Sequence, residues 1–351
     1  MRILKQCLFS AFFTLSILSL AACGGSSNNH SGPANNPGNT NPGGNPGNPD
    51  GDGGNSGDGN SDGGDDNDGT TGTFSLAVTD APADNADHVY VAFTGVTLHP
   101  VDGDPVVFTF EEAQNVDLLT LQGTASERLL NEQRVPVGDY ESVQLHLNAS
   151  HDGVMDSYVE MNDGTQLELG LEEEDRLTIA QEFSIASNGH VDFTVDLDLR
   201  RSLILPEGET DLTLRPSLRL VHTEQAGSIA CEVAETLISA ACDDPNASLG
   251  VVYIYEGADV VPTDVSDENG GPLTTAFVVF EEDVYTYEAG FLPAGEYTVA
   301  YTCDAINDDP QSVEEMDFYG VGNATVTAGE ETLYTFGPDA VLYDGATAET
   351  E

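Results

Sequence analysis

The stretch Val-Asp-Phe-Thr-Val-Asp-Leu-Asp-Leu-Arg, residues 191–200, decides the class of fold. Apolar side chains occupy the odd positions, whereas aspartate or threonine occupies the even positions up to 198. A period of two puts the two sets on opposite faces of a β-strand, so this stretch is predicted to be a strand with one face in a core. The acidic face is expected to lie in solvent. Its aspartates are about 7 Å apart, too distant to be adjacent ligands of one ion unless another strand contributes.

The same alternation continues on both sides of this strand. Short alternating runs recur from Phe74 to Val221 and are separated by Gly, Asp and Asn. After Ile229, runs of the same kind lie at residues 251–255, 276–280, 285–287, 298–302 and 324–326. We therefore predict an all-β protein with two antiparallel β-sandwich domains, at residues 73–225 and 227–340, and an acidic tail at residues 341–351.

Acidic residues far outnumber basic ones. The 351-residue chain holds 62 Asp and Glu against 9 Lys and Arg, and its formal charge is −53. This balance excludes a nucleic-acid-binding protein. Repulsion among the acids lowers stability in dilute buffer, whereas salt near 1 M screens the repulsion because the Debye length falls to about 3 Å. We infer a marine or halophilic source.

The N-terminus has the features of an export signal. Arg2 and Lys5 precede an apolar run at residues 8–20, which is too short to span a bilayer stably. The following Leu-Ala-Ala-Cys at residues 20–23 resembles the bacterial lipobox. The resemblance implies that residues 1–22 are a signal peptide and that Cys23 carries the lipid, palmitate included; the alternative is an ordinary secretory signal. Gly24 after the cysteine implies an address at the outer membrane, facing the periplasm or the cell surface.

Residues 23–72 begin with the lipidated cysteine and continue as a spacer. The spacer consists of Gly, Asn, Pro, Ser and Asp with almost no apolar residue, so it cannot bury enough surface to offset the entropy of ordering. We expect a disordered linker that holds the two domains on the order of 40 Å from the lipid.

Several short motifs in the first domain together resemble a known family of bacterial lipoproteins, catalogued as domain of unknown function 4382. The motifs are Thr-Asp-Ala-Pro at 79–82, Val-Asp-Leu-Leu at 116–119, Pro136, Gly138 and Tyr140, Ser-Leu at 202–203, and Arg-Pro-Ser-Leu-Arg-Leu-Val at 215–221. The resemblance implies the domain boundaries and the location of the protein. It brings no activity, catalytic residue or cofactor.

A second resemblance covers one hairpin of the second domain. Gly-Phe-Leu-Pro-Ala-Gly-Glu-Tyr at residues 290–297 is similar to the turn motif of carboxypeptidase-regulatory and transthyretin-like modules. Such modules usually act as spacers or binding scaffolds, so this likeness implies no catalysis.

Three cysteines remain after export: Cys231, Cys242 and Cys303. Disulfides persist in an oxidising compartment. We expect Cys242 to pair with Cys303, since each lies at the edge of a strong strand and closing a long loop stabilises by about 4 kcal/mol in the chain-entropy model. Pairing of Cys231 with Cys242 is the alternative.

Few residues suggest a metal site or catalysis. Asp80, Asp84, Asn85 and Asp87 crowd one loop and could bind calcium together with backbone carbonyls, which makes calcium the one cofactor suggested. The histidines at 99, 146 and 151 match no zinc pattern. No C-x-x-C, dinucleotide-binding or P-loop motif occurs in the mature sequence, and the two predicted domains contain no nucleophile elbow, so nucleophilic catalysis has no support.

These observations favour a non-enzymatic, lipid-anchored protein of the cell surface. We expect a role in adhesion, matrix or ligand binding, with the membrane as one partner and a protein or glycan ligand as the other. A calcium-dependent structural or assembly protein is the alternative, motivated by the acids at 80–87, 264–268 and 304–309. A glycan hydrolase with paired carboxylates is a second alternative.

Overall fold

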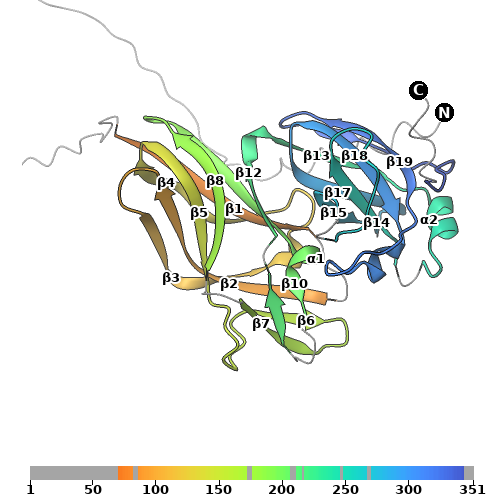
Figure 1. Cartoon of the computed structure of the whole chain (residues 1–351), viewed down its shortest axis with the longest axis horizontal. Helices are drawn as coiled ribbons and strands as arrows, with labels where there is room; N and C mark the ends of the chain where they lie inside the picture. Colours follow the sequence, from red (N-terminus) through yellow and green to blue (C-terminus); the bar gives the residue numbers. More distant parts are fainter. Residues whose placement is uncertain are drawn as a thin grey trace, which may run out of the picture. The chain divides into compact units, whose positions relative to one another are not determined.

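The computed structural model describes residues 70–81, 86–171, 176–205, 211–215, 217–245, 248–266 and 270–343. They form two β-sandwiches in succession along the chain (Figure 1). This confirms the predicted all-β class. The expected signal peptide, Cys23, the linker before residue 70 and the tail after residue 343 lie outside the described residues. Within the described residues, no helix is long and apolar enough to cross a membrane.

The first sandwich consists of a four-stranded and an eight-stranded sheet. The four-stranded sheet has the order β12-β9-β1-β4, and the larger sheet has the order β10-β11-β7-β6-β2-β5-β8 with β3 paired to β2. The strands are β1 (Thr71–Ala81), β2 (Ala86–Pro100), β3 (Val106–Asp117), β4 (Glu127–Pro136), β5 (Gly138–Leu147), β6 (Tyr158–Met161), β7 (Gln166–Leu171), β8 (Arg176–Ile185), β9 (His190–Asp198), β10 (Leu203–Ile204), β11 (Leu212–Leu214) and β12 (Leu218–His222). Short helical segments are η3 (Leu118–Thr120), α1 (Leu199–Ser202) and η4 (Thr223–Gln225).

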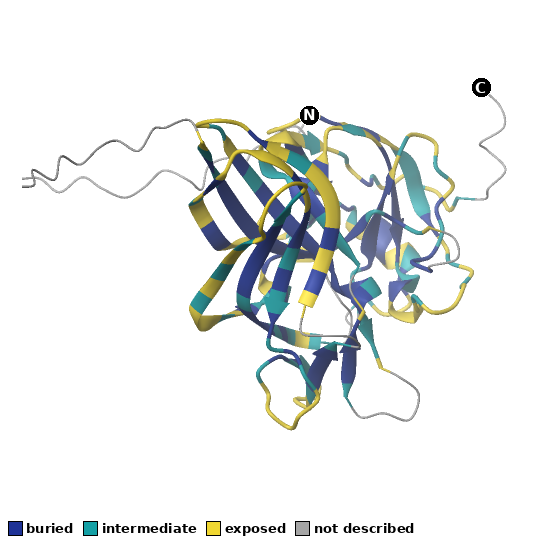
Figure 2. Ribbon diagram, turned by 60° about the vertical axis from the view of Figure 1, so that its left-hand side comes forward, coloured by how far each residue is buried: buried dark blue, intermediate teal, exposed yellow. Residues whose placement is uncertain are grey.

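Period-two patterning builds the core of this sandwich. Phe74, Leu76 and Val78 of β1 are fully buried and pack in one cluster with Val89 and Val91 of β2, so the two sheets meet through these residues. Figure 2 shows buried residues along the inner faces of the strands and exposed residues at their outer ends and loops. The sequence predicted antiparallel sheets, but the sheets are not purely antiparallel. Three strand pairs are parallel: β1 with β9 and β11 with β7 in the first sandwich, and β13 with β20 in the second.

The second sandwich consists of two four-stranded sheets, with the orders β16-β17-β13-β20 and β15-β14-β18-β19. Its strands are β13 (Ala226–Glu232), β14 (Val251–Glu256), β15 (Thr274–Phe277), β16 (Val279–Glu281), β17 (Val284–Pro293), β18 (Gly295–Thr302), β19 (Tyr319–Val326) and β20 (Glu331–Leu333). Two helical segments, α2 (Glu235–Ala241) and η5 (Asp304–Asn307), were not expected from the alternating pattern. Each predicted run falls within one of these strands, except that residues 276–280 divide between β15 and β16.

A disulfide joins Cys242, directly after α2, to Cys303, directly after β18. The two Cα atoms are 5.2 Å apart. This is the pairing that the sequence favoured over Cys231 with Cys242. The Sγ atom of Cys231 lies 3.0 Å from Oγ1 of Thr335.

Two expectations about residues 191–200 are wrong. The strand ends at Asp198, because its carboxylate accepts a hydrogen bond from Arg201 N and begins the short helix α1. The acidic face is also not solvated. Thr194, Asp196 and Asp198 are 1%, 4% and 6% exposed. β9 lies between β1 and β12, and residues of the second sandwich cover its outer face.

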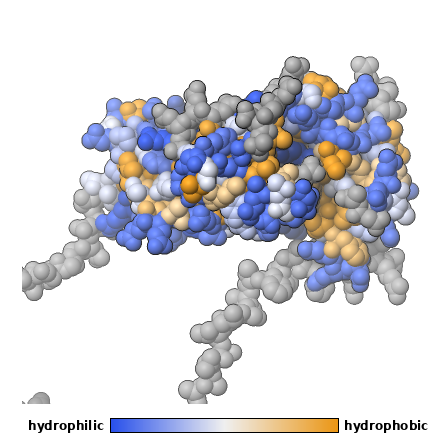
Figure 3. All heavy atoms as spheres, turned by 90° about the horizontal axis from the view of Figure 1, so that it is seen from below, coloured by the Kyte–Doolittle hydropathy of each residue, from blue (hydrophilic) through white to orange (hydrophobic). Residues whose placement is uncertain are grey.

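Most of the visible surface in Figure 3 is hydrophilic, with smaller apolar areas among the polar residues. This agrees with the acidic composition of the chain.

Candidate functional site

The four residues predicted to bind calcium are only partly placed by the structure. Asp80, near the end of β1, is 5% exposed, and its Oδ1 accepts a hydrogen bond from Leu199 N at 3.3 Å. Asp87, on β2, is exposed. Asp84 and Asn85 lie outside the described residues. The buried carboxylate of Asp80 therefore holds the start of α1 in place, and a calcium site on this loop remains a prediction.

Three other carboxylates converge in the second sandwich. Oxygens of Asp264, Asp308 and Glu314 lie within 4.8 Å of one another, and Asp264 is only 1% exposed. Asp264 and Asp308 belong to the two acidic runs that motivated the calcium alternative. Asp264 and Asp308 are 44 residues apart in the chain. Asp264 precedes β15, and Asp308 follows η5.

Hydrogen bonds already engage these carboxylates. Asp308 accepts from Val265 N at 3.1 Å and from the hydroxyl of Tyr253, and Asp264 accepts from Glu314 N at 2.6 Å. Burial raises the pKa of Asp308, and the nearby charge of Arg200 acts in the opposite direction. Hydrogen bonds through these carboxylates thus join the two loops, and oxygen ligands of this kind are those that calcium prefers.

A different group of side chains lies on the outer face of the eight-stranded sheet. His88 and Tyr90 alternate on β2 with the buried Val89 and Val91, so they point away from the core. Strand pairing places Glu160 beside His88 and Tyr158 beside Tyr90. On the other side of β2, Asp117 of β3 is the partner of Tyr90. We call His88, Tyr90, Asp117, Tyr158 and Glu160 the outer-face cluster.

The rings of this cluster form a continuous row. The ring centroids of His88 and Tyr90 are 5.5 Å apart, and those of Tyr90 and Tyr158 are 4.8 Å apart. Offset ring pairs at such distances attract one another and hold the side chains in fixed positions. The row is thus a preformed aromatic surface across two strands, with the side chain of His88 42% exposed.

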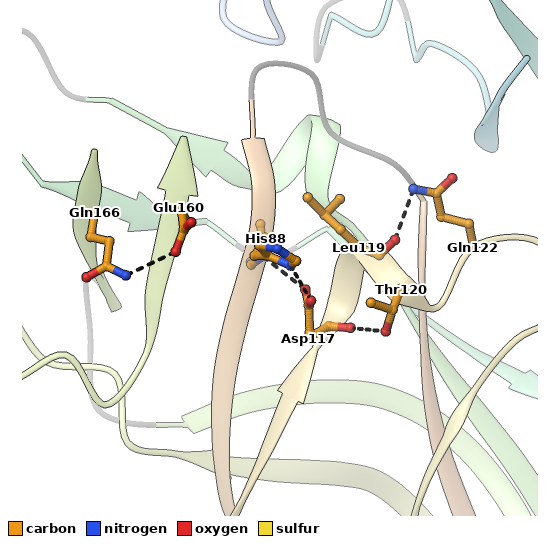
Figure 4. Close-up of polar contacts among 8 residues, drawn as sticks. His88, Asp117, Leu119, Thr120, Gln122, Glu160 and Gln166 are labelled. Carbon is orange, nitrogen blue, oxygen red and sulfur yellow. Dashed lines mark hydrogen bonds and ion pairs between the residues drawn. The ribbon is translucent and has the colours of Figure 1, made fainter. Parts of the chain in front are cut away.

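Polar groups lie on both sides of His88 (Figure 4). His88 Nδ1 lies 2.6 Å from Oδ2 of Asp117, and Asp117 Oδ1 accepts from Val89 N at 3.2 Å. On the far side, Gln166 Nε2 donates to Glu160 Oε2 at 3.0 Å. Carboxylates held in this way keep further lone pairs for a ligand.

Charge sets the protonation of the cluster. The hydrogen bond to Asp117 raises the pKa of His88, and the charges of Asp117, Glu160 and Asp87 add to the rise. Removal from solvent raises the pKa of Tyr90, and the charge of Asp117 acts in the same direction. The cluster therefore presents the neutral phenol of Tyr90 beside a histidine whose charge depends on pH.

The expectations from the sequence did not include this cluster. One signal could have found part of it, because Val89, Val91 and Phe93 alternate with other residues, and this alternation puts His88 and Tyr90 on the opposite face of a strand. The partners Asp117, Tyr158 and Glu160 come from β3 and β6, and only the pairing of these strands with β2 reveals them.

Comparison with known proteins shows the family of the first sandwich. Residues 71–216 match the family model described as domain of unknown function (DUF4382). The match ends before β12 and does not include the second sandwich. No curated protein matches the chain.

Solved structures give only weak likenesses. The TIE protein of Bacillus anthracis is 13% identical with a TM-score of 0.18, and the match covers 76% of this chain and 34% of that one. The chain thus spans about a third of that protein's length. CBMbc (family CBM26) from Eubacterium rectale Amy13K is 10% identical over 77% of this chain and 96% of that one, with a TM-score of 0.18. The fimbrial anchor protein Mfa2 of Porphyromonas gingivalis is 11% identical over 67% and 80%, with a TM-score of 0.16.

At these low TM-scores the likenesses carry no argument about this protein. The family match does not depend on these likenesses, because it comes from the sequence of residues 71–216. Residues 71–216, which form most of the first sandwich, match the model of the DUF4382 family, as the sequence motifs suggested.

Proposed function

We propose that the protein is a lipid-anchored binding protein of the cell surface and that the outer-face cluster contacts a neutral glycan. The observation that carries this proposal is the row of rings formed by His88, Tyr90 and Tyr158 beside the carboxylates of Asp117 and Glu160. Aromatic side chains supply apolar contact for the C–H groups of a sugar. Carboxylate oxygens accept hydrogen bonds from its hydroxyls.

The charge of the site selects against acidic ligands. Asp87, Asp117 and Glu160 all act on His88, which shows that several negative charges lie around it. The whole chain carries a formal charge of −53, so long-range repulsion adds to this local effect. Neither the local nor the long-range repulsion acts on a neutral polysaccharide.

A glycan array tests the ligand class. We would use the mature chain with Cys23→Ser, which is soluble because it lacks the lipid, and probe it with neutral and acidic polysaccharides. Tyr90→Ala and Tyr158→Ala are expected to weaken binding to neutral glycans by at least about tenfold, the effect of losing about 1.4 kcal/mol. Tyr285→Ala, in the second sandwich, is the matched control. Binding that is equally strong in all three variants would refute the site.

The membrane anchor is tested separately. Labelling of growing cells with palmitate is expected to mark the wild-type protein and not the Cys23→Ser variant, because the thiol at position 23 is the proposed attachment point. Labelling that survives the substitution would contradict lipid anchoring at this residue and leave the glycan proposal untouched.

Calcium-dependent structure is a second candidate function, supported by the convergence of Asp264, Asp308 and Glu314. Calorimetric titration in high salt is expected to show heat and a higher Tm with millimolar Ca²⁺, and neither with Asp264→Asn. The exposed Asp87→Asn is the control. Absence of both effects in the wild-type protein would discard this candidate.

A further inference from the structure

The few basic residues of the mature chain are distributed unevenly. With Arg2 and Lys5 removed from the nine Lys and Arg, seven remain, and all of them are arginine. Two of these seven, Arg200 and Arg201, are consecutive in α1, at the edge of the first sandwich. Arg200 is 6% exposed. Burying a guanidinium costs free energy unless its N–H groups donate to nearby acceptors, so a buried Arg200 requires such acceptors.

The partners of Arg200 lie in the second sandwich. Arg200 NH1 donates to the carbonyl of Ala305 in η5 at 2.9 Å. The guanidinium carbon is 5.8 Å from the ring centroid of Phe277 in β15, a distance typical of a cation–π contact. Burial raises the pKa values of Asp308 and Tyr253, and the positive charge of Arg200 opposes the rise in both. One side chain therefore contacts or acts upon η5, β15 and β14.

Arg201 makes a parallel connection. Its NH1 donates to the carbonyl of Pro272, just before β15, at 3.2 Å. Its backbone N donates to Asp198 at the end of β9. The same short helix thus links β9 of the first sandwich to two segments of the second.

The loop after η3 provides another contact between the sandwiches. Thr124 Oγ1 donates to Glu288 Oε1 of β17 at 3.1 Å. A Cβ atom added to Gly290 would lie 2.1 Å from the carbonyl oxygen of Gly123. The two backbones approach so closely that position 290 has no room for a side chain.

Between these contacts, the polar face of β9 and β1 is closed off from solvent. Thr79 and Asp196 share a small cavity with Thr275, Glu288 and Gly290 of the second sandwich. The cavity volume is about 10 Å³, which is the space of a single water molecule. This packing helps to explain why Asp196, which was expected in solvent, is buried.

We infer that α1 holds the two sandwiches together as one rigid unit that unfolds cooperatively, and that this coupling depends on Arg200. An arginine suits this position because its planar fork offers five donors and stacks on a ring, whereas lysine offers a compact charge. This coupling of the two domains does not depend on what the outer-face cluster binds.

Calorimetry tests this inference. The mature chain with Cys23→Ser is expected to unfold in a single transition in high salt, with equal calorimetric and van't Hoff enthalpies. Arg200→Gln removes the charge and most of the donors, so we expect its transition to divide in two. Arg200→Lys keeps the charge and is expected to divide likewise. Arg176→Gln, at the exposed start of β8, is the matched control and should keep one transition.

A second experiment does not require a variant of Arg200 to fold. A protease site inserted between Glu224 and Gln225, which are exposed in η4 between the sandwiches, allows the chain to be cut after folding. We expect the two halves to co-elute in gel filtration after cleavage. Separation of the halves, two transitions in the wild-type chain, or an Arg200→Gln profile identical to that of Arg176→Gln would each overturn the inference.

Discussion

Asp198 is a buried carboxylate of the first sandwich whose charged form is unfavourable. Burial raises its pKa to about 6, and the charge of Asp196 adds to the rise, while the hydrogen bond from Arg201 N acts against it. The ordinary value is 3.8, so the folded protein binds this proton more tightly than the unfolded chain. The associated stability is fully present below pH 3.8 and is lost as the pH rises through about 6.

The variant Asp198→Asn should remove this pH dependence. An asparagine retains an acceptor for Arg201 N and never carries the charge. From pH 4 to pH 7, we expect the free energy of unfolding of the variant to increase relative to wild type by up to about 3 kcal/mol, since each pKa unit corresponds to about 1.4 kcal/mol. Urea unfolding at both pH values measures the difference. Asp87→Asn serves as an exposed control, and parallel profiles for wild type and Asp198→Asn would show the argument to be wrong.

At the scale of elements, the two sandwiches use the same turn. Pro136, Gly138 and Tyr140 precede or begin β5, and Pro293, Gly295 and Tyr297 stand in the same spacing at the start of β18. The hydroxyl of Tyr140 donates to Pro136 O at 2.8 Å, and that of Tyr297 donates to Pro293 O at 2.7 Å. Each tyrosine closes the turn that precedes its strand.

Tyr140→Phe and Tyr297→Phe should each destabilise the protein. The change removes a hydroxyl and with it a partly buried hydrogen bond to a proline carbonyl, which costs about 1 kcal/mol. Urea unfolding measures the loss, with Tyr158→Phe on the outer face as the control. If both variants matched the control, these hydrogen bonds would not contribute to stability.

The disulfide acts on the connection between α2 and β18. It closes a loop of 61 residues, which stabilises the folded chain by about 4 kcal/mol if the entropy of the unfolded state dominates. We expect Cys242→Ala with Cys303→Ala to lower the free energy of unfolding by about this amount. Reduction of the wild-type protein should produce the same loss, and a loss that differs clearly between the two treatments would point to packing of the sulfur atoms instead.

At the scale of the whole molecule, charge governs stability. A formal charge of −53 on 351 residues produces repulsion that folding brings to closer range. We expect Tm to rise steeply between 0.1 M and 1 M NaCl, because the Debye length falls from about 10 Å to about 3 Å. KCl should act equally well, since screening does not distinguish the two cations. A Tm independent of salt, or a response to one cation only, would contradict general screening.

The sequence by itself determined the class of fold and the family. Alternating residues predicted most of the strands, since a strand with one buried face repeats every two residues regardless of its neighbours. The same rule is consistent with His88 and Tyr90 on the face opposite Val89 and Val91. Several short motifs, taken together, suggested the family that residues 71–216 match. These features are local, so the chain expresses them without reference to distant residues.

Only the tertiary structure decided what lies against each face. The alternating pattern distinguishes the two faces of β9, but it does not show which other segments cover each face. For this reason Asp196 and Asp198 were expected to lie in solvent. Both are buried, and residues of the second sandwich surround Asp196. In the same way, Asp117 and Tyr158 join His88 only through strand pairing across long separations in the chain. Burial and pairing depend on contacts between remote segments, and no local pattern encodes those contacts.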